Sequence, residues 1–461
     1  MVFSSLIFIF AYLSVTIAVY YISPLRLRNL VLFVVSLVFY GWGEPTYITL
    51  MLVSIVSAYA FGFLIEKYRD KNIKTARLFL VLSLLTNLSF LLFFKYYNFF
   101  AENIGFAVIE DLTLPVGISF YTFQIMSYSI DLYRGTVPLA KKFVPFGTYV
   151  TLFPQLIAGP IVMYKDVCDQ LVSRKESIAK FASGVNRFVI GLSKKLILGD
   201  SAAAVAEYIK TSTSFEPTVI GTWMIMICYT FHIYFDFSGY SDMAIGLGRM
   251  FGFEFVENFN YPYIAKSITD FWRRWHITLS TWFREYIYIP LGGNRVGKLR
   301  GFFNLAVVWF LTGFWHGADW NYILWGVYFC VFLVIEKAFL RKVLEKIPFV
   351  SHVYTLLVIG FGWIIFFYTD LTQIGEIFKH LIGIEASFVG LAGGYEALRL
   401  LPFVIICAIG CTPLPKRIYT KLCARFKAIN QASPIFMIVL FIICIAYMVD
   451  NTFSPFLYYI F

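Results

Sequence analysis

The feature that most constrains this chain is the repeated occurrence of apolar segments long enough to cross a lipid bilayer. A transmembrane helix needs about 20 predominantly apolar residues, and such segments recur along all 461 residues, for example at 2–22, 46–65, 78–94, 218–235 and 435–449. Only 14% of the residues are charged, against about 25% in soluble domains. The chain is therefore predicted to be an all-α polytopic membrane protein, with a single membrane domain over residues 1–461.

The basic residues indicate how the segments are oriented. The opening segment, 2–22, lacks a basic n-region and a small-residue cleavage site, so we expect a retained first helix and not a signal peptide. Lys and Arg collect in cytoplasmic loops, and the basic stretches 66–74 and 133–142 alternate with 41–45 and 101–111, which contain no Lys or Arg. This alternation places both termini outside, with about 11 spans.

Charge and cysteine content exclude several classes of protein. The net charge of +11 does not indicate nucleic-acid binding, because the basic residues sit in short loops between spans, where they set topology. Seven cysteines form no CxxC pair and no regular spacing. Neither a disulfide framework nor a metal site is therefore predicted.

Two segments are unlike simple spans. The stretch "YVTLFPQLIAGPIV" (149–162) is interrupted by Pro154, Gly159 and Pro160, as in a re-entrant loop. The stretch "DFWRRWHITLSTWFREYIYIPLGGNR" (270–295), taken as one helix, has an aromatic face and carries too many charges for a lipid-facing span. It is predicted to line a polar cavity or, alternatively, to lie in the interface as an amphipathic helix. Asp270 would cap this helix, and "LGGNR" would form a turn.

A histidine occurs deep in an apolar segment of "FLTGFWHGADWNYILWG" (310–326). His316 falls about 14 residues into its predicted helix, or roughly 20 Å along the axis. An ionisable group at that depth is costly and usually faces a cavity. The alternative is a neutral buried imidazole that donates to a backbone carbonyl. His276 also follows a tryptophan. This repetition weakens the alternative without excluding it, so both a functional and a packing role remain open for the two histidines.

A third histidine lies in "FHIYFDFSGYSDMAIG" (231–246). His232 is within a predicted span and is followed by Asp236 and Asp242. A packing and hydrogen-bonding role is favoured for His232 over a place in a substrate passage.

The chemistry available to a buried imidazole limits the function classes. A near-neutral histidine can act as general base toward a hydroxyl that attacks an acyl thioester. The sequence has no GxSxG, P-loop, HExxH or GxGxxG motif, which leaves hydrolase, nucleotidase, metalloprotease and dinucleotide-binding functions without support. Acyl transfer in a membrane cavity and proton-coupled transport through histidines both remain open.

Five stretches together resemble the membrane-bound O-acyltransferase (MBOAT) family, in its bacterial alginate O-acetyltransferase (AlgI)-like branch. They are "LPVGISFYTFQIMSYSIDLYRG" (114–135), "FPQLIAGPIV" (153–162), "FDFSGYSDMAIGLGRMFGF" (235–253), "NFNYPYIAKSITDFWRRWHITLSTWFREYIYIPLGGNR" (258–295) and "WFLTGFWHGADWNYILWG" (309–326). The resemblance implies a fold with re-entrant or interfacial helices around a central funnel or tunnel. It also implies that His316 is the catalytic general base and that His276 assists acyl positioning or charge stabilisation. Tunnel or substrate-contact positions are expected at Trp315, Trp275, Asp319, Asn321, Arg273, His232 and Asp236.

The resemblance further implies O-acetylation of an exported polysaccharide at the bacterial plasma or inner membrane. The acyl donor would be acetyl-CoA or a carrier-protein thioester, with no bound cofactor or metal. An extracytoplasmic SGNH-type protein and the polysaccharide-export machinery are the expected partners, besides membrane lipid. The alternatives are D-alanyl transfer to teichoic acid, an acyl-group transporter without its own chemistry, and a scaffold for an acetylating complex. The forms "YIPLGGNR" and "SITDFWRRWHITLS" favour acetyl over D-alanyl.

Overall fold

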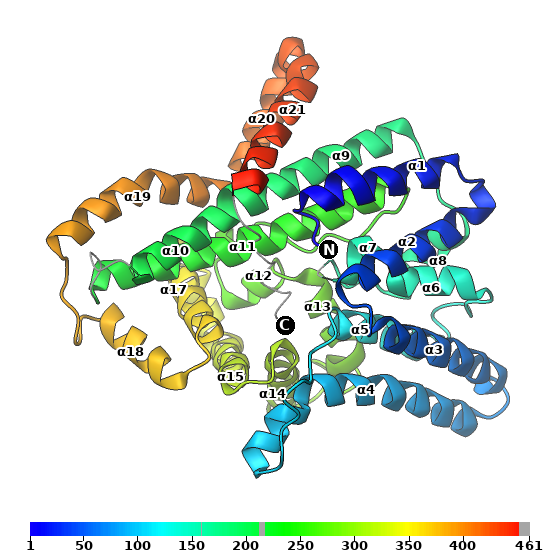
Figure 1. Cartoon of the computed structure of the whole chain (residues 1–461). Helices are drawn as coiled ribbons and strands as arrows, with labels where there is room; N and C mark the ends of the chain where they lie inside the picture. The colour runs from blue at the N-terminus through cyan, green and yellow to red at the C-terminus, as the bar shows by residue number, and fades with distance from the viewer. Residues whose placement is uncertain (158, 212–216, 451–461) are drawn as a thin grey trace. The chain divides into compact units, whose positions relative to one another are not determined.

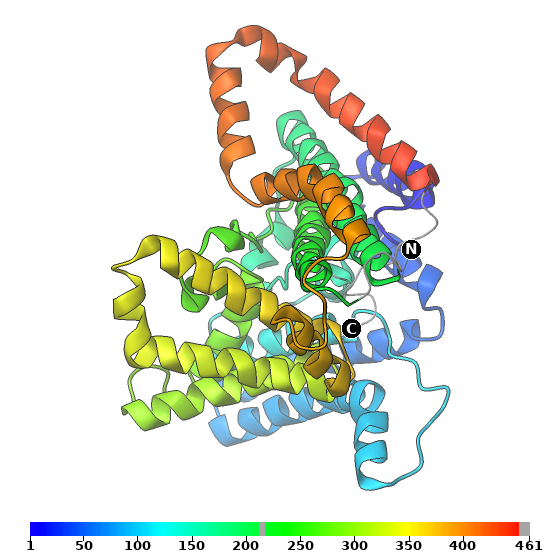
Figure 2. The same ribbon diagram turned by 90° about the vertical axis from the view of Figure 1, so that its left-hand side faces the viewer.

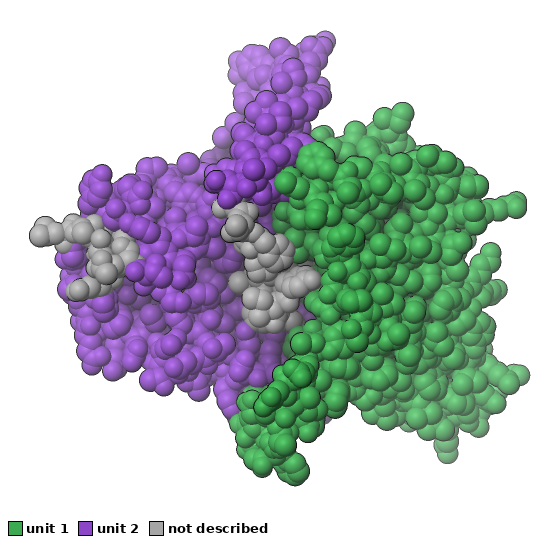
Figure 3. Space-filling model, viewed as in Figure 1, with its two compact units in different colours: residues 1–190, 240–257, 458–461 green, residues 191–239, 258–457 purple. Residues whose placement is uncertain are grey.

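The structure is a computed structural model that describes residues 1–157, 159–211 and 217–450. Within these residues the secondary structure is helical (Figure 1), apart from an isolated bridge between Thr218 and Ser387. The predicted all-α class is confirmed. Figure 3 shows the two compact units of the chain. Of the described residues, the first unit contains 1–190 and 240–257, and the second contains 191–239 and 258–450. The single-domain assignment stays a prediction.

The first unit begins with a π-helical segment and continues through nine α-helices. Its elements are the π-helical segment Ile7–Leu13, α1 (Ser14–Ile22), the 3-10 turn Leu25–Leu27, α2 (Arg28–Gly43), α3 (Ile48–Arg69), α4 (Ile73–Ile104), α5 (Ile118–Arg134), α6 (Phe143–Thr151), α7 (Phe153–Leu156), α8 (Tyr164–Val172) and most of α9 (Ile178–Ser193). The end of α11 (Val219–Met250) also belongs to it. The predicted interruption of 149–162 is present, because α6 ends at Thr151 and α7 contains only four residues.

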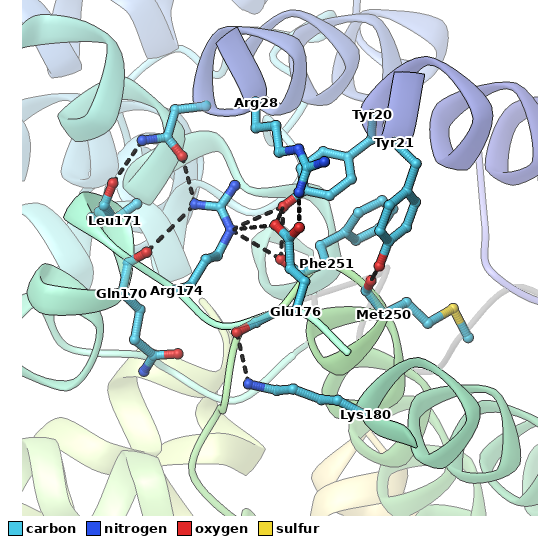
Figure 4. Close-up of polar contacts among 12 residues, drawn as sticks. Tyr20, Tyr21, Arg28, Gln170, Leu171, Arg174, Glu176, Lys180, Met250 and Phe251 are labelled. Carbon is cyan, nitrogen blue, oxygen red and sulfur yellow. Dashed lines mark hydrogen bonds and ion pairs between the residues drawn. The ribbon is translucent and has the colours of Figure 1, made fainter. Parts of the chain in front are cut away.

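A polar cluster joins three separate stretches of the first unit (Figure 4). Arg174, between α8 and α9, donates from Nε to the hydroxyl of Tyr20 at 3.0 Å and from a terminal nitrogen to Oδ1 of Asn29 at 2.7 Å. Glu176 pairs with Arg28 and accepts from Tyr20. Because these charges are largely withdrawn from solvent, their mutual pairing offsets the cost of burial.

The second unit contains the remaining helices and three π-helical segments. Its elements are the π-helical segment Lys194–Asp200, α10 (Ser201–Thr211), the first part of α11, the 3-10 turn Pro262–Ile264, α12 (Ile268–Trp272), α13 (Ile277–Phe283), the π-helical segment Arg284–Tyr288, α14 (Lys298–His316), α15 (Trp320–Ile335), the π-helical segment Glu336–Leu340, α16 (Arg341–Leu344), α17 (Pro348–Phe367), α18 (Leu371–Leu381), α19 (Leu391–Gly410), α20 (Leu414–Arg425) and α21 (Lys427–Asp450). Figure 2 shows α20 and α21 as a hairpin that projects away from α14, α15 and α17.

Seven helices of the described chain are long and apolar enough to cross a membrane. They are Leu25–Gly43, Ile48–Arg69, Ile73–Ile104, Val219–Met250, Trp320–Leu344, Pro348–Phe367 and Lys427–Asp450. An eighth arises if Gly394–Gly410 and Leu414–Arg425, which meet at 69°, form one bent span. The chain is therefore a multi-pass membrane protein. The predicted number of about 11 spans is not confirmed, because several apolar stretches fold as shorter or interrupted helices, such as Ile7–Ile22.

Candidate active site

His316 is the last residue of α14, and close packing of α14 against α15 positions it. A Cβ atom added to Gly313 would lie 2.3 Å from the carbonyl oxygen of Tyr322, and one added to Gly326 would lie 2.4 Å from that of Trp309. Glycines at such contacts let two helix backbones approach closely. The helix begins at Lys298, earlier than predicted, and ends at His316. His316 therefore lies further from the start of the helix than the predicted 14 residues and forms its C-terminal end.

Residues 270–295 do not form the single helix that the aromatic spacing predicts. They fold as the end of α12, α13 and a π-helical segment, and the break falls at His276. His276 has φ +44° and ψ 54°, a left-handed conformation that is uncommon for a residue other than glycine. That conformation ends one helical turn and starts the next. The single-helix prediction is wrong for this reason, and the continuous aromatic face that depended on it is wrong as well.

The start of α12 is held by two side chains. Ser267 Oγ accepts from the backbone N–H of Asp270 at 3.0 Å, so Ser267 is the cap and not Asp270 as predicted. The carboxylate of Glu336, which is 1% exposed, accepts from the backbone N–H groups of Ile268 at 2.6 Å and Thr269 at 2.9 Å. These N–H groups have no partner within the helix, and the carboxylate satisfies them. Glu336 thereby ties α12 to the end of α15.

A buried amide orients the His276 ring. Oδ1 of Asn258 accepts from the backbone N–H of Thr278 at 3.3 Å and from its hydroxyl at 2.9 Å. His276 Nδ1 lies 3.1 Å from the same oxygen. An oxygen that accepts from a backbone N–H is the carbonyl end of the amide. Nδ1 of His276 is therefore the protonated nitrogen, and Nε2, at the other side of the ring, carries the lone pair when the ring is neutral.

The surroundings of His276 favour that neutral form. The residue is 1% exposed, and it lies outside the helices that qualify as spans. Burial lowers the pKa of His276 to about 3, because removal from water disfavours the imidazolium. The ring of Phe237 packs edge-on against it, with the centroids 4.8 Å apart.

Both histidines border one cavity of about 230 Å³. Its walls come from α12, α13, α14, α15 and the π-helical segment Arg284–Tyr288. The lining residues are Thr269, Trp272, Arg273, Trp275, His276, Leu279, Ser280, Phe283, Arg284, Tyr288, Leu305, Val308, Trp309, Thr312, His316 and Leu333. The cavity therefore combines two imidazoles and two guanidinium groups with an aromatic wall. Such a site can bind an apolar acyl group beside groups that accept or hold a proton.

Aromatic rings surround His316, which is 4% exposed. The ring centroids of Trp315 and Trp325 each lie 5.0 Å from that of His316, and that of Phe366 lies 5.3 Å away. All three rings meet the imidazole edge-on. These contacts restrict the rotation of His316 and limit the access of water to it.

Three of the seven further predicted positions lie at the cavity or against its histidines. Trp275 and the exposed Arg273 line it. Trp315 does not line the cavity but contacts both histidines, because its ring centroid lies 6.3 Å from that of His276 as well as close to that of His316.

The other four predicted positions are not among the residues that line this cavity. Asn321 donates to the carbonyl oxygens of Ile365 and Phe366, both at 3.2 Å, and so joins α15 to α17. His232 Nδ1 lies 3.0 Å from the carbonyl oxygen of Gly199. Asp236 pairs with Lys195 at 3.4 Å, and Asp319 directly precedes α15. A role for these residues in a longer passage stays a prediction.

Two residues that support the site, Asn258 beside His276 and Glu336 at the start of α12, were not predicted from the sequence. Asn258 lies at the start of the "NFNYPYIAKS" stretch, 18 positions before His276, and Glu336 lies 68 positions after Ile268. The role of Glu336 could have been suspected from the sequence, because a carboxylate at the end of a highly apolar segment needs hydrogen-bond donors. The role of Asn258 had no such indication beyond its residue type.

Comparison with known proteins relates the chain to one family of membrane enzymes. The model of the MBOAT, membrane-bound O-acyltransferase family matches residues 140–374, a range that contains both histidines and Asn258.

Three relatives show how far the similarity extends. The probable alginate O-acetylase AlgI of Azotobacter vinelandii is 39% identical, over 89% of this chain and 85% of the relative. The peptidoglycan O-acetyltransferase of Helicobacter pylori is 36% identical, over 84% and 80% respectively. The teichoic acid D-alanyltransferase of Bacillus subtilis is 31% identical, but over only 49% of this chain and 59% of the relative.

Proposed function

The chain belongs to the membrane-bound O-acyltransferase family and is a membrane O-acyltransferase, and we propose that it serves the O-acetylation of an exported cell-surface or wall polysaccharide. Support comes from the relatives. Those similar over most of the chain are a probable alginate O-acetylase and a peptidoglycan O-acetyltransferase, whereas similarity to the D-alanyltransferase covers about half of the chain. The observation that carries the proposal is the presence of His276 and His316 on one cavity.

We propose the following chemistry for that cavity. His316 takes the proton from an acceptor hydroxyl as general base, and the oxygen attacks the carbonyl carbon of the donor thioester. The carbon–sulfur bond then breaks, and the departing thiolate receives the proton from His316. The products are an O-acyl ester and a free thiol, so no net proton is released. The tryptophans of the wall exclude water that would hydrolyse the thioester.

The tautomer of His276 narrows its proposed role. With Nδ1–H directed at Asn258 Oδ1, a neutral His276 presents a lone pair on Nε2. It can accept a hydrogen bond but cannot donate one to a developing oxyanion. We therefore assign it to positioning the donor, through an amide N–H of the pantetheine arm that acetyl-CoA and carrier-protein thioesters share. Of the two expected roles, acyl positioning is thus favoured over charge stabilisation.

The setting of the reaction is also part of the proposal. Acetyl-CoA is the proposed donor, with a carrier-protein thioester as the alternative. An extracytoplasmic SGNH-type protein and the export machinery would complete transfer to the polymer. The bacterial plasma or inner membrane, with both termini outside, is the proposed location.

The test is transfer of labelled acetyl groups by the purified, reconstituted protein. Substitution His316→Ala is expected to lower the rate by about 10²- to 10⁴-fold, the usual contribution of a general base. His380→Ala serves as the matched control, because His380 lies on α18 and does not line the cavity. Near-wild-type transfer by the His316→Ala protein would refute the catalytic assignment. Replacing acetyl-CoA by a D-alanyl thioester in the same assay distinguishes the two acyl groups.

A further inference from the structure

The hairpin of α20 and α21 carries a concentration of positive charge that the acyl transfer does not use. Five cations lie within twelve residues, at Lys416, Arg417, Lys421, Arg425 and Lys427. No Asp or Glu occurs between Thr412 and Val449. All five side chains are exposed, and within the described part of the chain none of them forms an ion pair with a carboxylate. Their charge is therefore available to an anionic ligand.

The charges on α20 form an ordered row. Arg417, Lys421 and Arg425 follow one another at four-residue intervals, so their side chains lie on one face of the helix. A second row at the same interval contains Leu414, Ile418 and Leu422, which are 49%, 49% and 39% exposed. Each cation follows a member of the apolar row by three residues and is therefore its neighbour on the helix surface. The helix thus presents adjacent apolar and cationic stripes, both uncovered.

The position of α20 in the chain indicates which kind of surface these two stripes contact. It leads directly into α21, the candidate span of highest mean hydropathy, 2.6, of which only 6% is buried within the protein. It also bends away from α19 by 69°. Four cations in a twelve-residue helix are too many for the hydrocarbon layer, so α20 is not the second half of a span that α19 begins. A helix with adjacent cationic and apolar rows binds at a membrane surface.

We infer that α20 is an interfacial helix that binds anionic lipid headgroups. Arg417, Lys421 and Arg425 contact the lipid phosphates, while Leu414, Ile418 and Leu422 enter the boundary between headgroups and acyl chains. This goes beyond the topology-setting role that basic loops have in membrane proteins. It also does not depend on the proposed acyl transfer, because α20 contributes no residue to the cavity.

The loop between α3 and α4 provides the contrast. Lys71 lies in this loop, Lys67 lies in the last turn of α3 and Lys74 lies in the first turn of α4. Acidic residues lie nearby in the sequence, and Arg69 pairs with Glu66 at 2.8 Å. Because Lys67 and Lys74 lie on two different helices and Lys71 lies between them, these three cations do not form one row on a single helix. The loop is equally suited to set topology but is not expected to enrich anionic lipid.

The experiment reconstitutes the full chain into nanodiscs of phosphatidylcholine with a minor fraction of phosphatidylglycerol and measures how much phosphatidylglycerol co-purifies with the protein. The triple variant Arg417→Gln, Lys421→Gln, Arg425→Gln is compared with Lys67→Gln, Lys71→Gln, Lys74→Gln, which removes the same charge. Each cation near an anionic surface contributes about a fivefold preference. The preference of the α20 variant for phosphatidylglycerol is therefore expected to be on the order of a hundredfold lower than that of the wild type. The preference of the loop variant is expected to stay close to the wild-type value.

Salt and lipid composition separate the outcomes. Two results together support the inference. Phosphatidylglycerol is enriched only when the cations of α20 are present, and this enrichment falls as ionic strength rises. Equal enrichment by wild type and the α20 variant would overturn it, and would leave the row as a contact for an acidic soluble protein. An equal loss in both triple variants would also overturn it, since net charge alone would then explain the effect.

Discussion

Nδ1 of His276 lies 3.1 Å from Oδ1 of Asn258, and that same oxygen accepts from both the backbone N–H and the hydroxyl of Thr278. Three donors thus converge on one fully buried acceptor. The arrangement holds His276 in a left-handed backbone conformation and in one tautomer. Asn258 is a positioning residue, because it acts on the cavity through His276 and does not line the cavity itself.

Removal of the Asn258 acceptor should weaken donor binding. In Asn258→Leu the three donors lose their partner, and a buried hydrogen bond of this kind is worth about 1–3 kcal/mol. We expect the KM for the acyl donor to rise about 10- to 100-fold, with a smaller change in kcat. Steady-state kinetics at varied donor concentration measure this split. A fall in kcat at unchanged KM would instead place His276 in the chemical step.

Substitution Asn258→Asp should change the pH dependence of the reaction. The wild-type ring, with its pKa lowered to about 3, stays neutral across the working range, so His276 contributes no acid limb there. A carboxylate at position 258 favours the imidazolium and raises the pKa of His276. Activity of the Asp variant is expected near wild type at high pH and to fall as pH decreases through the raised pKa. A pH–rate profile that superimposes on the wild-type profile would contradict the assigned tautomer.

The contact between α14 and α15 should not tolerate one additional methyl group. In Gly313→Ala the new Cβ would lie 2.3 Å from a backbone oxygen, so α14 must move away from α15 and carry His316 with it. Overpacking of this kind costs about 1–3 kcal/mol. We expect a lower thermal unfolding temperature in detergent and a loss of acyl transfer. Gly375→Ala on α18, where the Cβ meets nothing within 4 Å, is the matched control and should change neither quantity.

Glu336 should matter for the start of α12 and, through it, for the cavity. Glu336→Ala leaves the backbone N–H groups of Ile268 and Thr269 without their acceptor, at a cost of about 1–3 kcal/mol for each buried group. The thermal unfolding temperature of Glu336→Ala is expected to be lower than that of the wild type. Glu336→Gln keeps one acceptor oxygen and should therefore recover part of this decrease. Glu345→Ala removes an exposed carboxylate paired with Arg341 and should have little effect. A Glu336→Ala protein as stable as Glu345→Ala would contradict the capping role.

Hydropathy and motifs predicted the class of the molecule and singled out the two histidines that border one cavity. The apolar segments predicted a helical multi-pass membrane protein, and four of the five example segments overlap candidate spans over most of their length. The two Trp–His pairs identified His276 and His316 before any geometry was known. The membrane-spanning character of a segment and the identity of its residues are local properties. They can therefore be predicted for each segment without knowledge of the rest of the chain.

The tertiary structure alone decided the number of candidate spans, the break at His276 and the partners of the site. The aromatic spacing of 270–295 fits one helix, yet the hydrogen bonds of Asn258 and the capping of α12 by Glu336 favour three short ones. Neither partner is close in sequence to the group it holds. A hydrogen bond between residues far apart in sequence forms only when the fold brings their segments together. No property of a single segment predicts which other segment it will contact.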